Sequence, residues 1–228
     1  MNQRVYYNGL WVFGDSYSAK AGLADNEDLR KFYKKHHVKD WAELLSDELQ
    51  APLQRKAMGG AGMGWIMNEL IHTLPYMKPN DIVVISDTML TRLEGYDKRT
   101  DEIKTLDNER IFYKEPTEED NHLVPVRGKR NQDIVNKYTI EFIYNNYEAW
   151  EKYYIEQLKS INRLLSDRFI ELYFWSHRLW DTQELTRFSR IEEETDGLIH
   201  DAHWGMVGHQ EFFKYIYTRI KNKEYFDI

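Results

Sequence analysis

Residues 81–86 read DIVVIS and form the clearest β-strand signal in the sequence. The stretch is rich in β-branched residues, follows Pro79 and Asn80, and is succeeded by polar residues. An apolar run without polar alternation is typical of a parallel strand that is buried on both faces beneath helices. The stretch therefore predicts an α/β protein.

Shorter segments on either side of 81–86 predict the other strands. Residues 10–13 end at Gly14, residues 52–58 run into the glycine-rich GGAGMG, and residues 169–175 (FIELYFW) end at Ser176 and His177. Each run is short and is bounded by turn-forming residues, as expected of strands.

Helical patterns lie between these strands and after the last of them. Asp40 and Glu43 have the spacing of a capping box and precede an amphipathic stretch over 41–49. Further helices are predicted around 65–70, from 134 to 165, and from Met206 onward, where His209, Phe212, Phe213, Ile216 and Ile220 share one face. This alternation predicts a three-layer α/β/α domain with a flavodoxin-like parallel sheet.

One long segment departs from this alternation. From about residue 95 to 133 the chain is polar and contains Pro116 and Pro125, with no periodicity beyond a possible hairpin at 110–113. We therefore expect a single domain over residues 1–228 with an insertion, or lid, at about 95–133.

Composition and charge exclude several classes of protein. The 228 residues carry a formal net charge of −7, which argues against a nucleic-acid partner because phosphate binding needs clustered cations. No apolar run approaches the ~20 residues that cross a bilayer, so no membrane association is expected. Without cysteine the chain has no disulfide, thiolate metal ligand or cysteine nucleophile.

The N-terminus predicts a location. It reads MNQRVYYNGLWVF and lacks the basic region, apolar core and cleavage site of a secretory signal. A cytoplasmic protein is therefore expected, although packaging in a phage particle would leave the same sequence pattern.

Polar and small residues follow each predicted strand. Ser16 comes after the first strand, four glycines at 59–64 after the second, Ser86, Asp87 and Thr88 at the end of the third, and Ser176 and His177 after the fourth. Ligands of open parallel sheets bind beyond the carboxyl ends of the strands. The sequence thus predicts a site at this edge.

A serine acts as a nucleophile when a base takes its proton and a third group orients that base. Asp201 and His203 are one residue apart and precede the last helix, so they are candidates for these roles. The amides of Ser16 and Gly60 are candidate donors to a negatively charged oxygen.

Three segments resemble the conserved blocks of the SGNH, or GDSL-type, hydrolases. VFGDSYS (12–18) resembles the first block, WAELLSDELQAPLQRKAMGGAG (41–62) the second, and DAHWGMVGHQ (201–210) the last. The resemblance implies a serine esterase with Ser16 as nucleophile, His203 as base, Asp201 as acid and Gly60 as oxyanion donor. It implies no metal or organic cofactor.

The last block also suggests a substrate. Its Asp-x-His-Trp form resembles a branch that handles polysaccharide O-acetyl groups, so we expect a carbohydrate O-acetyl ester or another small acyl ester as the substrate. The oligomeric state is not predicted by any feature of the sequence.

The chain departs from the family pattern in two places. Residue 200, where the family has its acid, is a histidine, and the third block reads ISDTMLTR (85–92) without the usual asparagine. Thr88 is the candidate for the missing donor, and Asp15 joins Gly60 and Thr88 as oxyanion or substrate-binding candidates.

Other interpretations fit some of the same residues. Ser16 could serve only as a helix cap, the 59–64 glycines could bind phosphate, and a metal could bind His200, Asp201, His203 and His209. His209 is also expected as a satisfied core histidine. The alternative functions are a non-catalytic binding protein on a degenerate SGNH fold and an O-acyltransferase with the same triad.

Overall fold

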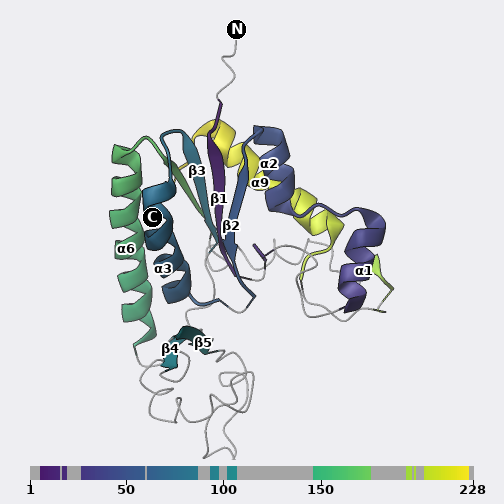
Figure 1. Cartoon of the computed structure of the whole chain (residues 1–228), viewed down its shortest axis with the longest axis horizontal. Coiled ribbons are helices and arrows are strands. Elements are labelled where there is room, and N and C mark those ends of the chain that lie inside the picture. The colour runs from purple at the N-terminus through teal and green to yellow at the C-terminus, as the bar shows by residue number, and fades with distance from the viewer. Residues whose placement is uncertain are drawn as a thin grey trace, which may run out of the picture.

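A computed structural model describes residues 6–15, 17–19, 27–59, 61–86, 93–97, 102–106, 146–175, 194–196, 198 and 203–225. The main sheet in this part of the chain contains β1 (Gly9–Gly14), β2 (Leu53–Ala57), β3 (Asp81–Ser86) and β6 (Glu171–Trp175). All neighbours pair in parallel, in the order β2-β1-β3-β6 (Figure 1). Numbered along the chain this order is 2-1-3-4, as in flavodoxin-like sheets.

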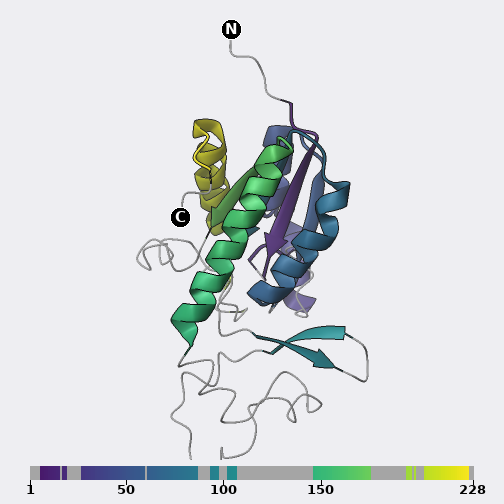
Figure 2. The ribbon, with the colours of Figure 1, turned by 90° about the vertical axis from the view of Figure 1, so that its left-hand side faces the viewer.

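Helices cover both faces of the sheet, which confirms the predicted three layers. One face is covered by α3 (Met63–Thr73) and α6 (Tyr147–Asp167), and the other by α2 (Trp41–Leu49) and α9 (Met206–Asn222) (Figures 1 and 2). The helix α1 (Glu27–His36) lies to one side, and the 3-10 helix η1 (Leu74–Tyr76) follows α3. None of the helices described is long and apolar enough to cross a membrane.

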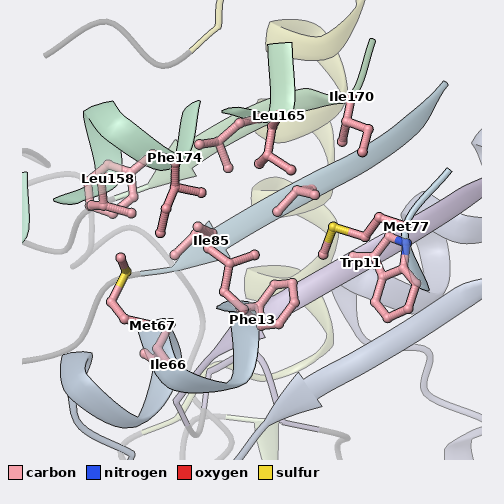
Figure 3. Close-up of a cluster of buried hydrophobic side chains, with 14 of the residues drawn as sticks. Trp11, Phe13, Ile66, Met67, Met77, Ile85, Leu158, Leu165, Ile170 and Phe174 are labelled. Atoms are coloured by element: carbon pink, nitrogen blue, oxygen red, sulfur yellow. The ribbon is translucent and has the colours of Figure 1, made fainter. Parts of the chain in front are cut away.

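Alternate residues of each strand face opposite layers, which divides the core into two clusters. Trp11, Phe13, Val83 and Ile85 pack with side chains from α3 and α6 (Figure 3). Leu10, Val12, Ile82 and Val84 pack on the opposite face with α2 and α9. Because each strand residue is buried on one face or the other, β1 and β3 read as continuous apolar runs in the sequence.

The predicted capping box starts α2. Oδ1 of Asp40 accepts hydrogen bonds from the amides of Ala42 and Glu43, each at 3.0 Å, and the Glu43 carboxylate accepts from the amide of Asp40 at 3.2 Å. Donors left unpaired at the helix start are thereby satisfied. The spacing in the sequence was sufficient to predict this contact.

The predicted strand at 169–175 begins too early. Phe169 has φ 59° and closes the end of α6, where its amide donates to the Ser166 carbonyl and that of Ile170 donates to the Leu165 carbonyl, both at 3.0 Å. This is the Schellman arrangement, which favours glycine at the left-handed position. Phe169 therefore belongs to the end of the helix, and its side chain is 76% exposed. The strand starts only at Glu171.

The structure shows a hairpin and a helix that were not predicted, and two predictions lie outside the described residues. The strands β4 (Leu93–Asp97) and β5 (Glu102–Leu106) form an antiparallel pair at the start of the predicted insertion, whereas the expected hairpin at 110–113 lies outside the described residues. The long helix is described from Tyr147, and its predicted start at 134 also lies outside. The helix α1 was not predicted.

Candidate functional site

The carboxyl ends of β1, β2 and β3 meet at one edge of the sheet. The amide of Met58, just after β2, donates to the carbonyl of Gly14 at 3.2 Å. A Cβ atom on Gly14 would lie 2.5 Å from Oγ of Ser18 and 3.0 Å from Oγ of Ser86. Only glycine therefore lets the turn after β1 fold back so closely onto the end of β3.

The turn after β1 is organised by Asp15, whose side chain is buried. Its Oδ1 accepts a hydrogen bond from the amide of Tyr17 at 3.1 Å, and its carbonyl accepts from Ser18 and Ala19 at 3.0 and 2.9 Å. A carboxylate that bonds the amide two residues on is typical of an Asx turn. Both residues that flank position 16 are thus held by specific contacts.

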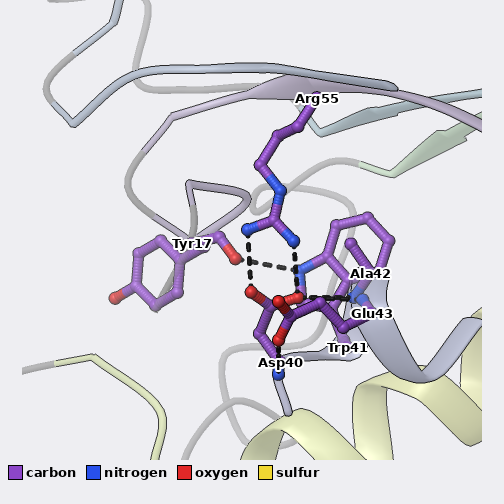
Figure 4. A network of polar contacts seen from close by, with 6 residues as sticks. All are labelled: Tyr17, Asp40, Trp41, Ala42, Glu43 and Arg55. Atoms are coloured by element: carbon purple, nitrogen blue, oxygen red, sulfur yellow. Dashed lines mark hydrogen bonds and ion pairs between the residues drawn. The ribbon is translucent and has the colours of Figure 1, made fainter. Parts of the chain in front are cut away.

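Tyr17 also receives a hydrogen bond from Trp41, the first residue of the second sequence block (41–62). The indole Nε1 of Trp41 donates to the Tyr17 carbonyl at 2.8 Å (Figure 4). Trp41 directly follows the cap residue Asp40, which receives two hydrogen bonds from the Arg55 guanidinium at 2.7 and 2.8 Å. The capping box and the Asp40–Arg55 ion pair therefore hold Trp41 in place, and its indole in turn holds the turn after β1.

Asp40 is charged as well as buried. Burial by itself favours the neutral carboxyl group, but the hydrogen bonds and positive charge of Arg55 outweigh it and lower the pKa of Asp40. Arg55 is itself largely buried, on β2. The pair is therefore a fixed internal link between β2 and the start of α2.

The segment before α9 lies against the same turn. The ring of Tyr17 contacts the imidazole of His203 and the indole of Trp204, each with ring centroids 5.0 Å apart. His203 is half-buried, whereas Trp204 is only 4% exposed and packs on Trp175 and Phe212. The first and last sequence blocks are thus brought together by an aromatic contact.

Two side chains, those of Glu194 and Tyr33, bond to the backbone of residues 204–207. The Glu194 carboxylate accepts hydrogen bonds from the amides of Met206 and Val207, at 2.9 and 3.2 Å, and so caps α9. A Cβ on Gly205 would lie 2.2 Å from that carboxylate. From the other side, the Tyr33 hydroxyl donates to the Trp204 carbonyl at 3.1 Å.

His209 lies one helical turn into α9 and is 5% exposed. Its Nδ1 is buried without a hydrogen-bond partner among the residues described, so burial is confirmed but the expectation of a satisfied histidine is wrong. Burial lowers its pKa to about 4, although the nearby charge of Asp40 acts in the opposite direction. The ring is therefore neutral at physiological pH.

The structure describes some of the predicted site residues. Asp15 and His203 are described; Ser16, Gly60, Thr88 and Asp201 lie outside the described residues, so the triad geometry stays a prediction. Asp87, Ser176, His177 and His200 lie outside as well. No group of three or more metal-ligating side chains occurs within the part of the chain that is described.

Several residues that shape this edge were missed in the sequence. Tyr17 and Trp204 adjoin predicted site residues, and this adjacency was the available signal. Tyr33 and Glu194 carry no local signal, because their partners lie far away in the chain.

The fold and this edge define a doubly wound α/β protein with a candidate ligand site beyond its carboxyl strand ends. No protein-family model and no curated protein matches the sequence. A solved structure from Desulfitobacterium hafniense, described as a candidate lipolytic protein of the G-D-S-L family, is similar at 11% identity and a TM-score of 0.35. The match covers 92% of this chain and 97% of that one, and at this TM-score it carries no argument about function.

Proposed function

We propose that this protein is a serine esterase of the SGNH type, with Ser16 as nucleophile, His203 as base and Asp201 as the group that orients the base. The observation that carries the proposal is the ring contact between Tyr17 and His203, with centroids 5.0 Å apart. Tyr17 directly follows Ser16 in the chain. The contact therefore supports a proton path between the first and last sequence blocks.

The proposed reaction has two stages. Oγ of Ser16 attacks the ester carbonyl while His203 takes its proton, and the tetrahedral intermediate then collapses as His203 protonates the leaving alkoxide. Water, deprotonated by His203, next attacks the acyl-enzyme, and Ser16 regains its proton as the acid is released. Asp201 keeps the imidazole in the tautomer that can accept the serine proton.

The oxyanion would be stabilised by the amides of Ser16 and Gly60. Thr88 is proposed in place of the family's asparagine, and loss of one such donor costs about 3 kcal/mol of transition-state stabilisation in a well-formed site. Asp15 is assigned to this site as an organiser, since its buried carboxylate holds the amide of Tyr17.

The proposed substrate is a carbohydrate O-acetyl ester or another small acyl ester, as the resemblance of the last block implies. The hairpin of β4 and β5 contacts α3, which begins within the glycine-rich segment 59–64, and it lies toward the carboxyl ends of the strands (Figure 2). We assign this hairpin to the rim that contacts the alcohol part of the substrate.

A fluorophosphonate probe tests the proposal directly, because it reacts only with an activated serine. Wild type should be labelled and Ser16→Ala should not. Ser160→Ala is the matched control, since Ser160 is exposed on α6 and bonds only to a carbonyl of its own helix among the residues described.

The outcome also separates the alternatives. A folded wild type that is not labelled contradicts the esterase and favours a binding protein, for which the missing third-block asparagine is the supporting observation. Labelled protein is then assayed on a panel of acetyl esters with and without a sugar acceptor. Transfer of the acyl group to the sugar, without free acid, would indicate an acyltransferase.

A further inference from the structure

The helix α1 carries mostly exposed charges but buries one tyrosine. Lys31, Lys34 and Lys35 are exposed, whereas Tyr33 is only 6% exposed. The hydroxyl of Tyr33 reaches the carbonyl of Trp204 in a buried hydrogen bond of 3.1 Å, and its ring contacts that of His209. This side chain therefore connects α1 to the segment that carries His203.

The position of this hydrogen bond matters because the 203–205 segment lies outside the helices and the main sheet, and only Trp204 within it forms an isolated β-bridge. The Trp204 carbonyl accepts from Tyr33 and the Gly205 carbonyl accepts from the amide of His209, while Glu194 caps the next two amides at the start of α9. His203 directly precedes Trp204, and its imidazole rests on Tyr17. A shift of the Trp204 peptide would therefore move the imidazole relative to the turn after β1.

We infer that Tyr33 is a positioning residue for His203, so that α1 takes part in the reaction although it supplies no reacting group. The inference rests on the proposed function. Tyr33 acts through the Trp204 carbonyl, to which its hydroxyl donates. Its hydroxyl keeps the base within reach of the serine, and effective proton transfer depends on such geometry.

The test compares Tyr33→Phe with Tyr153→Phe. Both substitutions remove only a phenolic hydroxyl, but Tyr153 lies on α6, is 52% exposed, and bonds to Gln157. Fluorophosphonate labelling rates are measured from pH 5 to 9 over a range of probe concentrations. Urea unfolding of wild type and both variants checks that each protein is folded. We expect both variants to fold, because each keeps the aromatic ring of the tyrosine.

The expected result is a maximal labelling rate roughly tenfold lower in Tyr33→Phe, because small displacements of a catalytic group have effects of this size or larger. The half-saturating probe concentration stays unchanged and the midpoint of the pH profile shifts. Tyr153→Phe behaves as wild type in all three respects.

Two other results separate this inference from the proposed function. Labelled wild type together with a Tyr33→Phe variant of the same rate and pH profile overturns the positioning role alone. A wild type that is never labelled overturns the esterase and the positioning role with it. A purely structural role would lower the urea midpoint and leave the labelling rate of the folded protein unchanged.

Discussion

Acid should destabilise this protein in a pH window set by His209. The imidazole is buried, and burial lowers its pKa in the folded state from the ordinary value of 6.5 to about 4. The unfolded state therefore binds a proton more readily, and stability is lost as the pH falls from about 6.5 to about 4. Asp40, Arg55, Glu194 and His203 are the charged or titratable groups that act on the ring.

The magnitude follows from the two pKa values. At pH 5 protonation favours the unfolded state by a factor of about 30, which corresponds to about 2 kcal/mol, whereas at pH 7 the effect is about 0.2 kcal/mol. Wild type should thus lose about 2 kcal/mol through this group between pH 7 and pH 5. Below the folded pKa both states carry the proton, and the loss stops growing at about 3 kcal/mol.

The assay is urea unfolding of wild type and His209→Phe at pH 7, 6 and 5. The variant keeps an aromatic ring in the site but cannot titrate, so its stability should vary less with pH by about 2 kcal/mol over this range. His36→Gln, at an exposed position of α1, serves as the control and should follow wild type. Equal losses of stability in wild type and His209→Phe would refute the reasoning.

Three substitutions test other parts of the structure by urea unfolding. Phe169→Gly should stabilise by about 0.5 kcal/mol, since relief of the left-handed φ exceeds the added entropy of glycine; a lower stability would contradict the Schellman assignment. Gly205→Ala should destabilise by about 1–2 kcal/mol, because the Cβ displaces the Glu194 carboxylate from α9; an unchanged midpoint would show that the cap is dispensable. Asp40→Asn should cost about 3 kcal/mol by leaving the buried Arg55 charge unpaired, whereas Asp47→Asn, in an exposed pair, should have little effect; equal effects would contradict the role of burial.

The strands β1 and β3 could be predicted because burial on both faces leaves a continuous apolar run, as in residues 81–86. The start of α2 was predictable because capping depends on contacts three residues apart. Phe169 misled the prediction because aromatic residues favour strands, while its observed conformation is set by the end of α6. The helix α1 was missed because its charged surface resembles a solvated run and its buried residue, Tyr33, contacts Trp204 and His209, which are distant in the sequence.

The candidate site was predictable only in part. The motifs at residues 12–18 and 201–210 indicated which segments matter, and the ring contact of Tyr17 with His203 joins them. The contributions of Tyr33 and Glu194 could not be predicted, because each depends on a partner that is adjacent only after folding. The positions of Ser16, Gly60, Thr88 and Asp201 stay predictions.

The two layers of the core stabilise different features of the molecule. The layer with α3 and α6 is largely aliphatic and holds regular elements, whose backbone groups are already paired within them. The layer with α2 and α9 contains Trp41, Trp175, Trp204 and Phe212, and it also holds the turn after β1 and the 203–205 segment. The turn has no regular ladder and the 203–205 segment has only the isolated bridge at Trp204, so side chains help to fix both.

Aromatic residues with a polar atom suit this task, because one end packs in the core while the other bonds to a backbone group. Trp41 does so at the Tyr17 carbonyl and Tyr33 at the Trp204 carbonyl. Changes that remove only the polar atom should therefore alter reactivity at the edge of the sheet more than they alter the stability of the fold.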